Sequence, residues 1–241
     1  MSTIDRAVVV TGASSGIGEA TALHLDELGF TVFAGVRKDG DGNALAAKTS
    51  DRLTPIRLDV TDADSIAAAA TFVEDATSGR LHALVNNAGL SVNGPLELLA
   101  VRQIEKLMHV NVIGLMAVSD SLRVELMPFG VAVSCLAVGK VETAVLGKIL
   151  AERDAMMRDA DPEVVELYRP LWEFFDREVK DLPGIPPVEV GKVVAQALTA
   201  ARPKPHYLVG PGARKMKNLA RLPVRLRDRL FFRTIYGGRP S

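Results

Sequence analysis

Short apolar runs alternate with helix-like segments along most of the chain, and this alternation restricts the fold more than any other feature. The strand-like runs lie at 7–10, 30–37, 53–60, 81–89, 131–138 and 206–210. Their nearly continuous apolar character is typical of parallel strands that are covered on both faces. Helical periodicity follows several of them, for example over 17–29 and 61–79. We therefore predict an α/β fold with a Rossmann-type, doubly wound parallel sheet of about six strands.

Length and composition are those of one ordinary globular domain covering residues 1–241. The formal net charge is zero, which gives the chain as a whole no attraction to nucleic acid. Cys135 is the only cysteine, so no disulfide forms within the chain and a reducing compartment is expected. No apolar stretch has the length of a signal peptide core or a bilayer span. We expect a cytoplasmic protein.

A glycine-rich turn, TGASSGIG (11–18), directly follows the first strand-like run. Its glycines are Gly12, Gly16 and Gly18, a spacing that allows a tight turn, approach of backbone to a pyrophosphate, and packing of the next helix. The helix N-terminus would present N–H groups and partial positive charge to phosphates. An ordinary strand–helix turn is the alternative, but the repeated β-α-β context favours a dinucleotide site.

Further motifs make the chain resemble the short-chain dehydrogenase/reductase family. They are TGASSGIG (11–18), LDVTD (58–62), NNAG (86–89), Asn111 within VNVIG, ELMPFGVAVS (125–134) and GKVET (139–143). LRVELMPFG and the HYLVG segment with its basic ending are most similar to the branch that acts on steroids and retinol. The resemblance implies an oxidoreductase that uses a nicotinamide dinucleotide and acts on a lipophilic alcohol or ketone.

The resemblance also implies which residues would hold the cofactor. Ser14, Ser15 and Ile17 would complete the phosphate loop with the three glycines. Asp59 and Val60 would meet the adenine, and Asn87, Ala88 and Gly89 the ribose side. Val141 and Thr143 would hold the nicotinamide carboxamide.

The end of the second strand bears on cofactor choice. A preference for NAD needs an acidic residue there to accept hydrogen bonds from the ribose 2′-hydroxyl. Val36 stands at that place, and Arg37 and Lys38 follow it. A cation favours a 2′-phosphate. Arg37 is either that phosphate ligand or a solvated strand end; we predict NADP as the preferred cofactor, with NAD possible.

The family's catalytic serine and its Tyr-x-x-x-Lys motif have no counterpart in this chain. Tyr168, Tyr207 and Tyr236 are its only tyrosines, and none is followed by lysine four residues later. Leu136 and Lys140 have that spacing, with leucine in place of the phenol. When the chain is aligned with the family pattern, residues 111–118 match the start of one family helix, and residues 119–130 match the end of the next helix. A strand and parts of two helices between them are therefore missing, and Asn111 is the only survivor of the catalytic group.

This interpretation has structural consequences. We expect the merged segment within 101–130, which has no helix breaker until Pro128, to form one helix. We also expect the sheet to close up to six strands, with one central strand fewer than the family has. The family's usual dimer is built from the two merged helices. A homo-oligomer is therefore possible, but with altered dimer helices.

Two functional hypotheses follow. The first is an NADP-dependent oxidoreductase with a replacement acid–base group. The second is a non-catalytic dinucleotide-binding pseudoenzyme, or an internally deleted variant of an active dehydrogenase. Joint loss of serine, tyrosine and lysine favours little or no activity. Tyr168 is the remaining acid candidate, and without a nearby lysine we expect its pKa to stay near 10.

Three peripheral features complete the interpretation. Residues 143–182 resemble the family's substrate lid, where Trp172, Phe174 and Phe175 line an apolar pocket or serve as plain core. The basic tail 211–241 either makes weak contact with an anionic membrane or is a solvated face. The four histidines lack metal-ligand spacing, so no metal site is expected.

Overall fold

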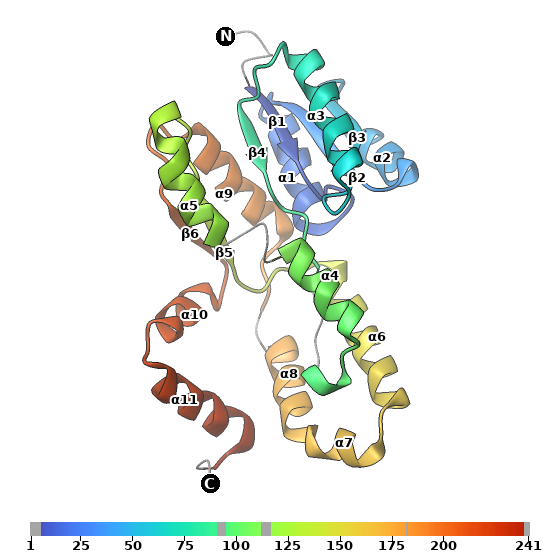
Figure 1. Cartoon of the computed structure of the whole chain (residues 1–241), viewed down its shortest axis with the longest axis vertical. Coiled ribbons are helices and arrows are strands. Elements are labelled where there is room, and N and C mark those ends of the chain that lie inside the picture. Colours follow the sequence, from blue (N-terminus) through green and yellow to red (C-terminus); the bar gives the residue numbers. More distant parts are fainter. Residues whose placement is uncertain (1–5, 91–94, 112–116, 182, 239–241) are drawn as a thin grey trace.

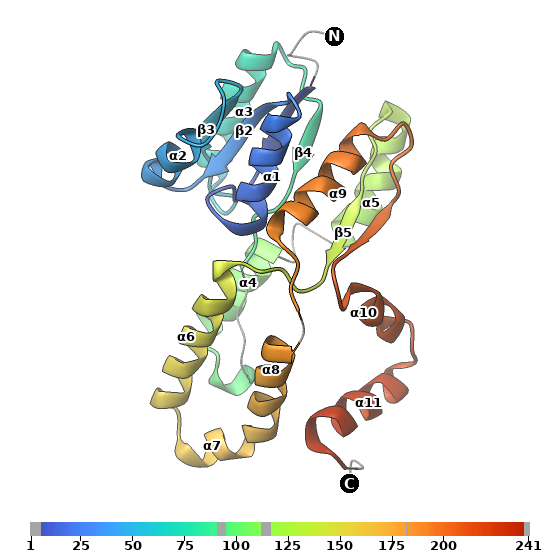
Figure 2. The ribbon, with the colours of Figure 1, turned by 180° about the vertical axis from the view of Figure 1, so that it is seen from behind.

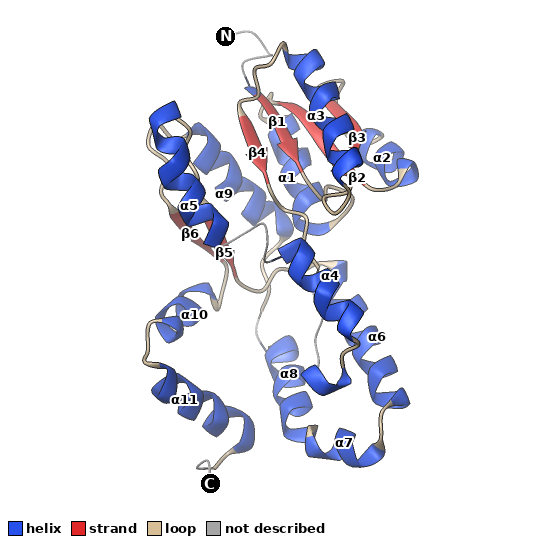
Figure 3. Cartoon of the chain, in the orientation of Figure 1, coloured by secondary structure: helices blue, strands red, loops and turns tan. Residues whose placement is uncertain are grey.

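The computed structural model describes residues 6–90, 95–111, 117–181 and 183–238 (Figure 1). Its strands are all parallel to their partners and are β1 (Ala7–Val10), β2 (Thr31–Val36), β3 (Leu53–Arg57), β4 (Ala83–Val85), β5 (Cys135–Val138) and β6 (His206–Val209). They form a four-stranded sheet in the order β3-β2-β1-β4 and a two-stranded sheet, β5-β6. Figure 3 shows the two groups of strands as separate red layers.

Helices surround both sheets and build the lower part of the molecule. They are α1 (Gly16–Glu27), α2 (Asp39–Ala46), α3 (Ala63–Thr77), α4 (Val101–Asn111), α5 (Ala117–Leu126), α6 (Ala144–Asp159), α7 (Pro162–Leu167), α8 (Arg169–Asp181), α9 (Pro187–Thr199), α10 (Ala213–Ala220) and α11 (Val224–Tyr236). Two 3-10 turns are η2 (Leu96–Leu98) and η3 (Met127–Phe129).

Alternation along β1 divides the core of the first sheet in two. Val8 and Val10 belong to the cluster that includes Leu25 of α1, whereas Ala7 and Val9 belong to the cluster that includes Val73 of α3. Successive side chains of a strand point to opposite faces, so one apolar run serves both layers. The predicted α/β class with a doubly wound parallel sheet is confirmed.

The six strands do not close into one sheet, and this part of the prediction is wrong. β5 lies between β4 and β6 in both views, yet it pairs with β6 alone among the described strands (Figures 1 and 2). Helix α9, which leads into β6, packs against α1, and a Cβ on its Gly191 would lie 3.2 Å from the Ala20 carbonyl oxygen. Among the described residues the second sheet is therefore joined to the first through helix packing and not through strand pairing.

The single helix predicted within 101–130 is also not found. The structure has two helices there, α4 and α5, which lie in different parts of the molecule (Figures 1 and 2). A shared apolar periodicity cannot distinguish one long helix from two helices in series.

Helices α6, α7 and α8 form a U-shaped excursion below the sheets (Figure 1). Arg153 of α6 donates hydrogen bonds to Asp176 of α8 and to Asp154, which ties the two arms together. Helix α11 packs against α8, so the C-terminal helices lie at the same end of the molecule as this excursion (Figures 1 and 2).

Candidate functional site

The glycine-rich turn packs so closely on its neighbours that side chains do not fit. Gly12 has φ +65°, and a Cβ there would lie 2.8 Å from the Cα of Ala88. A Cβ on Gly18 would lie 2.2 Å from the Gly12 carbonyl oxygen. Real Cβ atoms do not approach other atoms so closely, so both positions require glycine. The turn is thus a backbone cradle whose surface carries little side-chain bulk.

The first turn of α1 is open toward this cradle. Ser15 occupies the N-cap position, and its side chain makes no capping hydrogen bond within the described structure. Ser14 and Ser15 are both exposed. A helix N-terminus without a side-chain cap offers its N–H groups to an anion. The arrangement therefore fits a dinucleotide pyrophosphate.

Thr11 links the cradle to the NNAG segment after β4. Its buried Oγ1 accepts hydrogen bonds from the backbone N–H groups of Asn87 and Ala88, both at 3.0 Å. The Asn87 Nδ2 donates to the carbonyl oxygens of Thr11 (3.0 Å) and Gly12 (3.2 Å). The prediction from sequence omitted Thr11 as a site residue. Its signal was available, because it is a polar residue directly after a fully apolar strand.

Two further predicted positions lie at the carboxyl ends of neighbouring strands. Arg37 follows β2 and is exposed, and the Ala13 N–H donates to the Gly35 carbonyl oxygen (2.9 Å), which holds the glycine-rich turn against this strand. Asp59 follows β3, where its Oδ1 accepts hydrogen bonds from the N–H (2.9 Å) and hydroxyl (2.7 Å) of Thr61. Val60 is half-buried beside it. All these positions share one edge of the sheet, which is where ligands bind in open α/β folds.

The second half of the chain reaches the same edge through Thr143. A Cβ on Gly16 would lie 3.3 Å from the Thr143 Cγ2, so the two segments touch although they are far apart in sequence. Val141 is buried and bridges to Ile185, and the N–H of Ile185 donates to the Lys140 carbonyl oxygen (3.1 Å). These contacts hold the segment from Lys140 to Thr143 beneath the glycine-rich turn.

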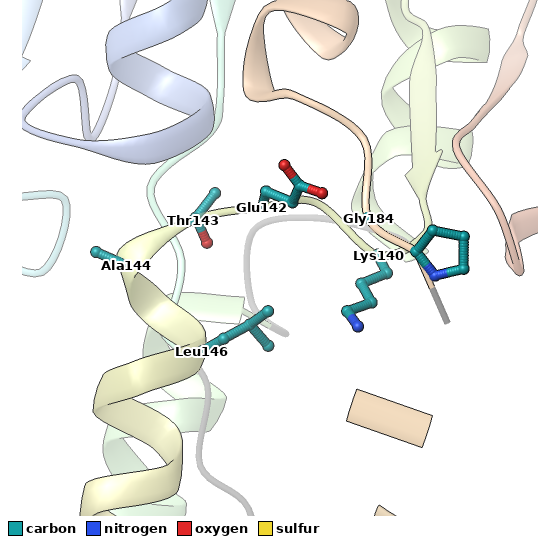
Figure 4. Close-up of a pocket in the computed structure, with 7 residues that line it drawn as sticks. Lys140, Glu142, Thr143, Ala144, Leu146 and Gly184 are labelled. Atoms are coloured by element: carbon teal, nitrogen blue, oxygen red, sulfur yellow. The ribbon is translucent and has the colours of Figure 1, made fainter. Parts of the chain in front are cut away.

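A cavity of about 490 Å³ opens beside Thr143. It is lined by Lys140, Glu142, Thr143, Ala144, Leu146, Pro183 and Gly184. Figure 4 shows the side chains of Lys140 and Leu146 on one side of the backbone, with the Glu142 carboxylate directed the opposite way. Lys140 is the one cationic side chain among these lining residues.

None of the three tyrosines lines this cavity. Tyr207 is buried in β6, where its hydroxyl accepts a hydrogen bond from the Lys204 N–H (3.0 Å). Tyr236 ends α11, and its ring stacks on Phe232 with centroids 4.9 Å apart. Tyr168 follows α7 at the bottom of the U-shaped excursion, far from the glycine-rich turn (Figures 1 and 2).

Tyr168 departs from the expectation of an ordinary pKa. A side-chain hydrogen bond with Glu97 raises the pKa of Tyr168 above its usual value, with further contributions from desolvation and from the Glu97 charge. The prediction of an unshifted pKa is therefore wrong. Sequence reasoning missed this because η2, which carries Glu97, meets Tyr168 only through tertiary folding. The shift makes Tyr168 a weaker acid at neutral pH.

Two other predicted features lie outside the cavity. Asn111 ends α4, but its side chain lies outside the described part of the structure. Trp172 is buried, and Phe174 and Phe175 contact each other with centroids 5.8 Å apart, but none of the three lines the cavity. Trp172 is thus buried away from this cavity, and whether the half-buried Phe174 and Phe175 serve a pocket or the core stays a prediction.

Neither a metal cluster nor a membrane span is found in the described ranges. No group of three or more His, Cys, Asp or Glu side chains there is placed to hold a metal ion. No described helix is both long enough and apolar enough to cross a bilayer.

Comparison with known proteins identifies the family. The family model described as short chain dehydrogenase matches residues 6–123. Retinol dehydrogenase 16 of Rattus norvegicus is 30% identical, with 95% of this chain and 89% of the relative covered. The chain therefore belongs to the short-chain dehydrogenase family, whose members are oxidoreductases that bind a nicotinamide dinucleotide, and it is similar to the retinol dehydrogenase branch.

Solved structures give the same fold. A short-chain dehydrogenase from Streptomyces avermitilis superposes with a TM-score of 0.71 at 22% identity, and the match covers 99% of each chain. A point variant of actinorhodin polyketide ketoreductase, solved with NADPH, gives a TM-score of 0.69 at 22% identity, covering 87% of this chain and 97% of that one.

The comparison with retinol dehydrogenase 16 also bears on the missing segment. The aligned stretch is 283 residues long, longer than this 241-residue chain, although it includes only 95% of the chain. The relative therefore contains residues that have no counterpart here. The family match stops at Arg123 in α5, close to the predicted junction between residues 118 and 119.

Proposed function

We propose that this chain binds NADPH at the carboxyl edge of its first sheet and reduces or oxidises lipophilic alcohols and ketones slowly or not at all. The observation that carries the proposal is the composition of the cavity beside Thr143. The site at that end contains a cofactor-binding backbone but no tyrosine to exchange a proton with the substrate oxygen. The protein is then a binding protein derived from a dehydrogenase.

The binding half of the proposal rests on the glycine cradle. Gly12 and Gly18 leave room for a pyrophosphate, and the first turn of α1 faces it. The adenosine ligands would be residues that follow the neighbouring strands, namely Asp59, Val60, Asn87, Ala88 and Gly89. The nicotinamide ligands would be Val141 and Thr143. Arg37, exposed at the end of β2, supports a 2′-phosphate and hence NADP over NAD.

The part of the proposal that concerns catalysis rests on where side chains that could exchange a proton with the substrate lie. When bound, the dinucleotide supplies or accepts a hydride. The substrate oxygen must gain or lose a proton in the same reaction, and a positioned acid or base contributes about 10²–10⁴ in rate. Tyr168 lies far from the cavity and is hydrogen-bonded to Glu97, so it cannot perform this role. Without such a group we expect weak turnover at most.

A second candidate function is residual oxidoreductase activity with Lys140 as the proton donor. Its position supports this candidate, because Lys140 lines the cavity next to Thr143 and its side chain extends into the space shown in Figure 4. Lysine serves as an acid or base where its surroundings tune it to the task.

Calorimetry and a turnover screen test both halves separately. We expect NADPH to bind and to raise the melting temperature, with weaker effects of NADH. Absorbance of NADPH at saturating protein should stay constant with retinoid, steroid and simple ketone substrates. Absence of heat with either cofactor would disprove the binding half. Turnover at ordinary enzyme rates would disprove the catalytic half, and its loss in Lys140→Met would establish the second candidate.

A further inference from the structure

Positive charge is concentrated in the two C-terminal helices. The whole chain has 29 Lys and Arg residues against 29 Asp and Glu residues. Helices α10 and α11 with their connection instead combine a single acid, Asp228, with the cations Arg214, Lys215, Lys217, Arg221, Arg225, Arg227, Arg229 and Arg233. Asp228 forms an ion pair with Arg227, in which the Arg227 Nε lies 3.7 Å from the Asp228 Oδ1. The remaining cations have no acid within this part of the sequence.

Apolar side chains are exposed among these cations. In α11, Phe231, Phe232 and Ile235 are half-buried where the helix packs against α8. Leu226 and Leu230 form a second row, one turn apart, and stay 46% and 39% exposed. Met216 of α10 is 56% exposed between Lys215 and Lys217.

The arginines border the exposed row of α11. Arg229 follows Leu226 by three positions and Arg233 follows Leu230 by three, so each lies beside its leucine on the helix surface. Both arginines are exposed. An apolar strip bordered by cations is the arrangement that lies in the interface of a lipid bilayer.

We propose that α10 and α11 form a docking surface for anionic lipid bilayers. The cations meet the negative headgroups, and Met216, Leu226 and Leu230 enter the boundary between headgroups and acyl chains. A nucleic acid would satisfy the cations but would leave these three apolar side chains in water. Charge complementarity and exposed apolar area together therefore favour the lipid surface.

Helices α10 and α11 lie at the same end of the molecule as α6–α8, and α11 packs against α8 (Figures 1 and 2). The cavity is lined by Ala144 and Leu146 of α6 and by Pro183 and Gly184 just after α8. A bilayer bound through Leu226 and Leu230 would lie on the outer side of α11, at the end of the molecule that also carries α6–α8. The docking itself does not depend on the proposed function.

Vesicle sedimentation of the full chain tests the proposal. We expect binding to vesicles of phosphatidylcholine with phosphatidylserine, weak binding to phosphatidylcholine alone, and release at high salt. The double variant Arg229→Glu/Arg233→Glu should bind at least about tenfold more weakly, because each cation near an anionic surface contributes. Arg80→Glu/Arg202→Glu is the matched control, since it makes the same charge change at exposed positions outside the two helices.

A second variant separates bilayer docking from general attraction to polyanions. Leu226→Ser/Leu230→Ser keeps every charge and should still weaken vesicle binding several-fold, while binding to duplex DNA stays unchanged. Circular dichroism of each variant establishes that it is folded. If the leucine variant binds vesicles as the wild type does, the bilayer proposal is wrong. No sedimentation of the wild type at low salt would also overturn it.

Discussion

The first sheet and the second sheet are built from the same kind of strand, yet they are buried to different degrees. All four residues of β1 are buried, because β2 and β4 pair with its two edges and helices cover its faces. The residues of β5 are half-buried or exposed, because it pairs with β6 alone among the described strands. Leu84 of β4, whose strand borders the separation between the sheets, is 53% exposed. A parallel strand is therefore buried by its neighbours rather than by its own apolar sequence.

The functional site is divided in the same way. The phosphate cradle belongs to the first sheet, where Thr11, Asn87 and the glycines fix it through backbone contacts. The cavity beside Thr143 is lined by the segment after β5, by the start of α6 and by the segment before α9, and it meets the cradle where Thr143 contacts Gly16. The two parts of the site therefore come from different halves of the chain.

Restoring the missing segment should have the largest effect. Insertion of a family strand and helix with its serine and Tyr-x-x-x-Lys motif between Val118 and Ser119 should raise turnover of a retinoid or steroid substrate by about 10²–10⁴. The reason is that a phenol then stands beside the substrate oxygen. The matched control is the same insertion with its tyrosine replaced by phenylalanine. Equal rates in both proteins would show that the register of the insertion is wrong.

The cradle should tolerate no side chain. Gly18→Ala forces a Cβ against the Gly12 carbonyl oxygen and should lower the free energy of unfolding by about 1–3 kcal/mol. NADPH binding should be lost with it, as measured by calorimetry. Gly40→Ala is the control, because a Cβ there meets nothing within 4 Å. A Gly18→Ala protein with wild-type stability and affinity would contradict the described packing.

Arg37 should decide the preference between the two cofactors. Arg37→Ala should weaken NADPH binding about tenfold, which corresponds to the loss of one charge-assisted contact, and should leave NADH binding unchanged. Arg57→Ala at the end of β3 is the control, since Arg57 is also exposed. If NADPH and NADH lose affinity equally in Arg37→Ala, Arg37 does not contact the 2′-phosphate.

Truncations in the interior strand β1 and in the edge strand β4 should have the smallest effects, and they test how far neighbouring strands bury a parallel strand. Val8→Ala in β1 removes methyl groups that are fully buried and should lower the free energy of unfolding by about 2 kcal/mol. Leu84→Ala removes a larger side chain, yet it should cost about 0.5 kcal/mol because half of that side chain is already in water. Urea unfolding measures both. A larger cost for Leu84→Ala would mean that another chain or segment covers β4 in solution.

The sequence alone was sufficient for the local structure and for the finding that no Tyr-x-x-x-Lys motif is present in it. Apolar runs, helical periodicity and the TGASSGIG turn predicted the elements of residues 6–90, since each depends on neighbours close in sequence. The lack of a Tyr-x-x-x-Lys motif could likewise be read directly, because a residue that is not in the chain cannot be supplied by folding.

Only the tertiary structure decided how the second half meets the first. Nothing in the sequence of 131–138 says that β5 pairs with β6 and not with β4, because an apolar run is compatible with either partner. The separation of α4 from α5 and the hydrogen bond that raises the pKa of Tyr168 beside Glu97 have the same origin. These features depend on contacts between segments that are distant in the sequence. The packing of α9 against α1 and the approach of Thr143 to Gly16 are two further contacts of this kind.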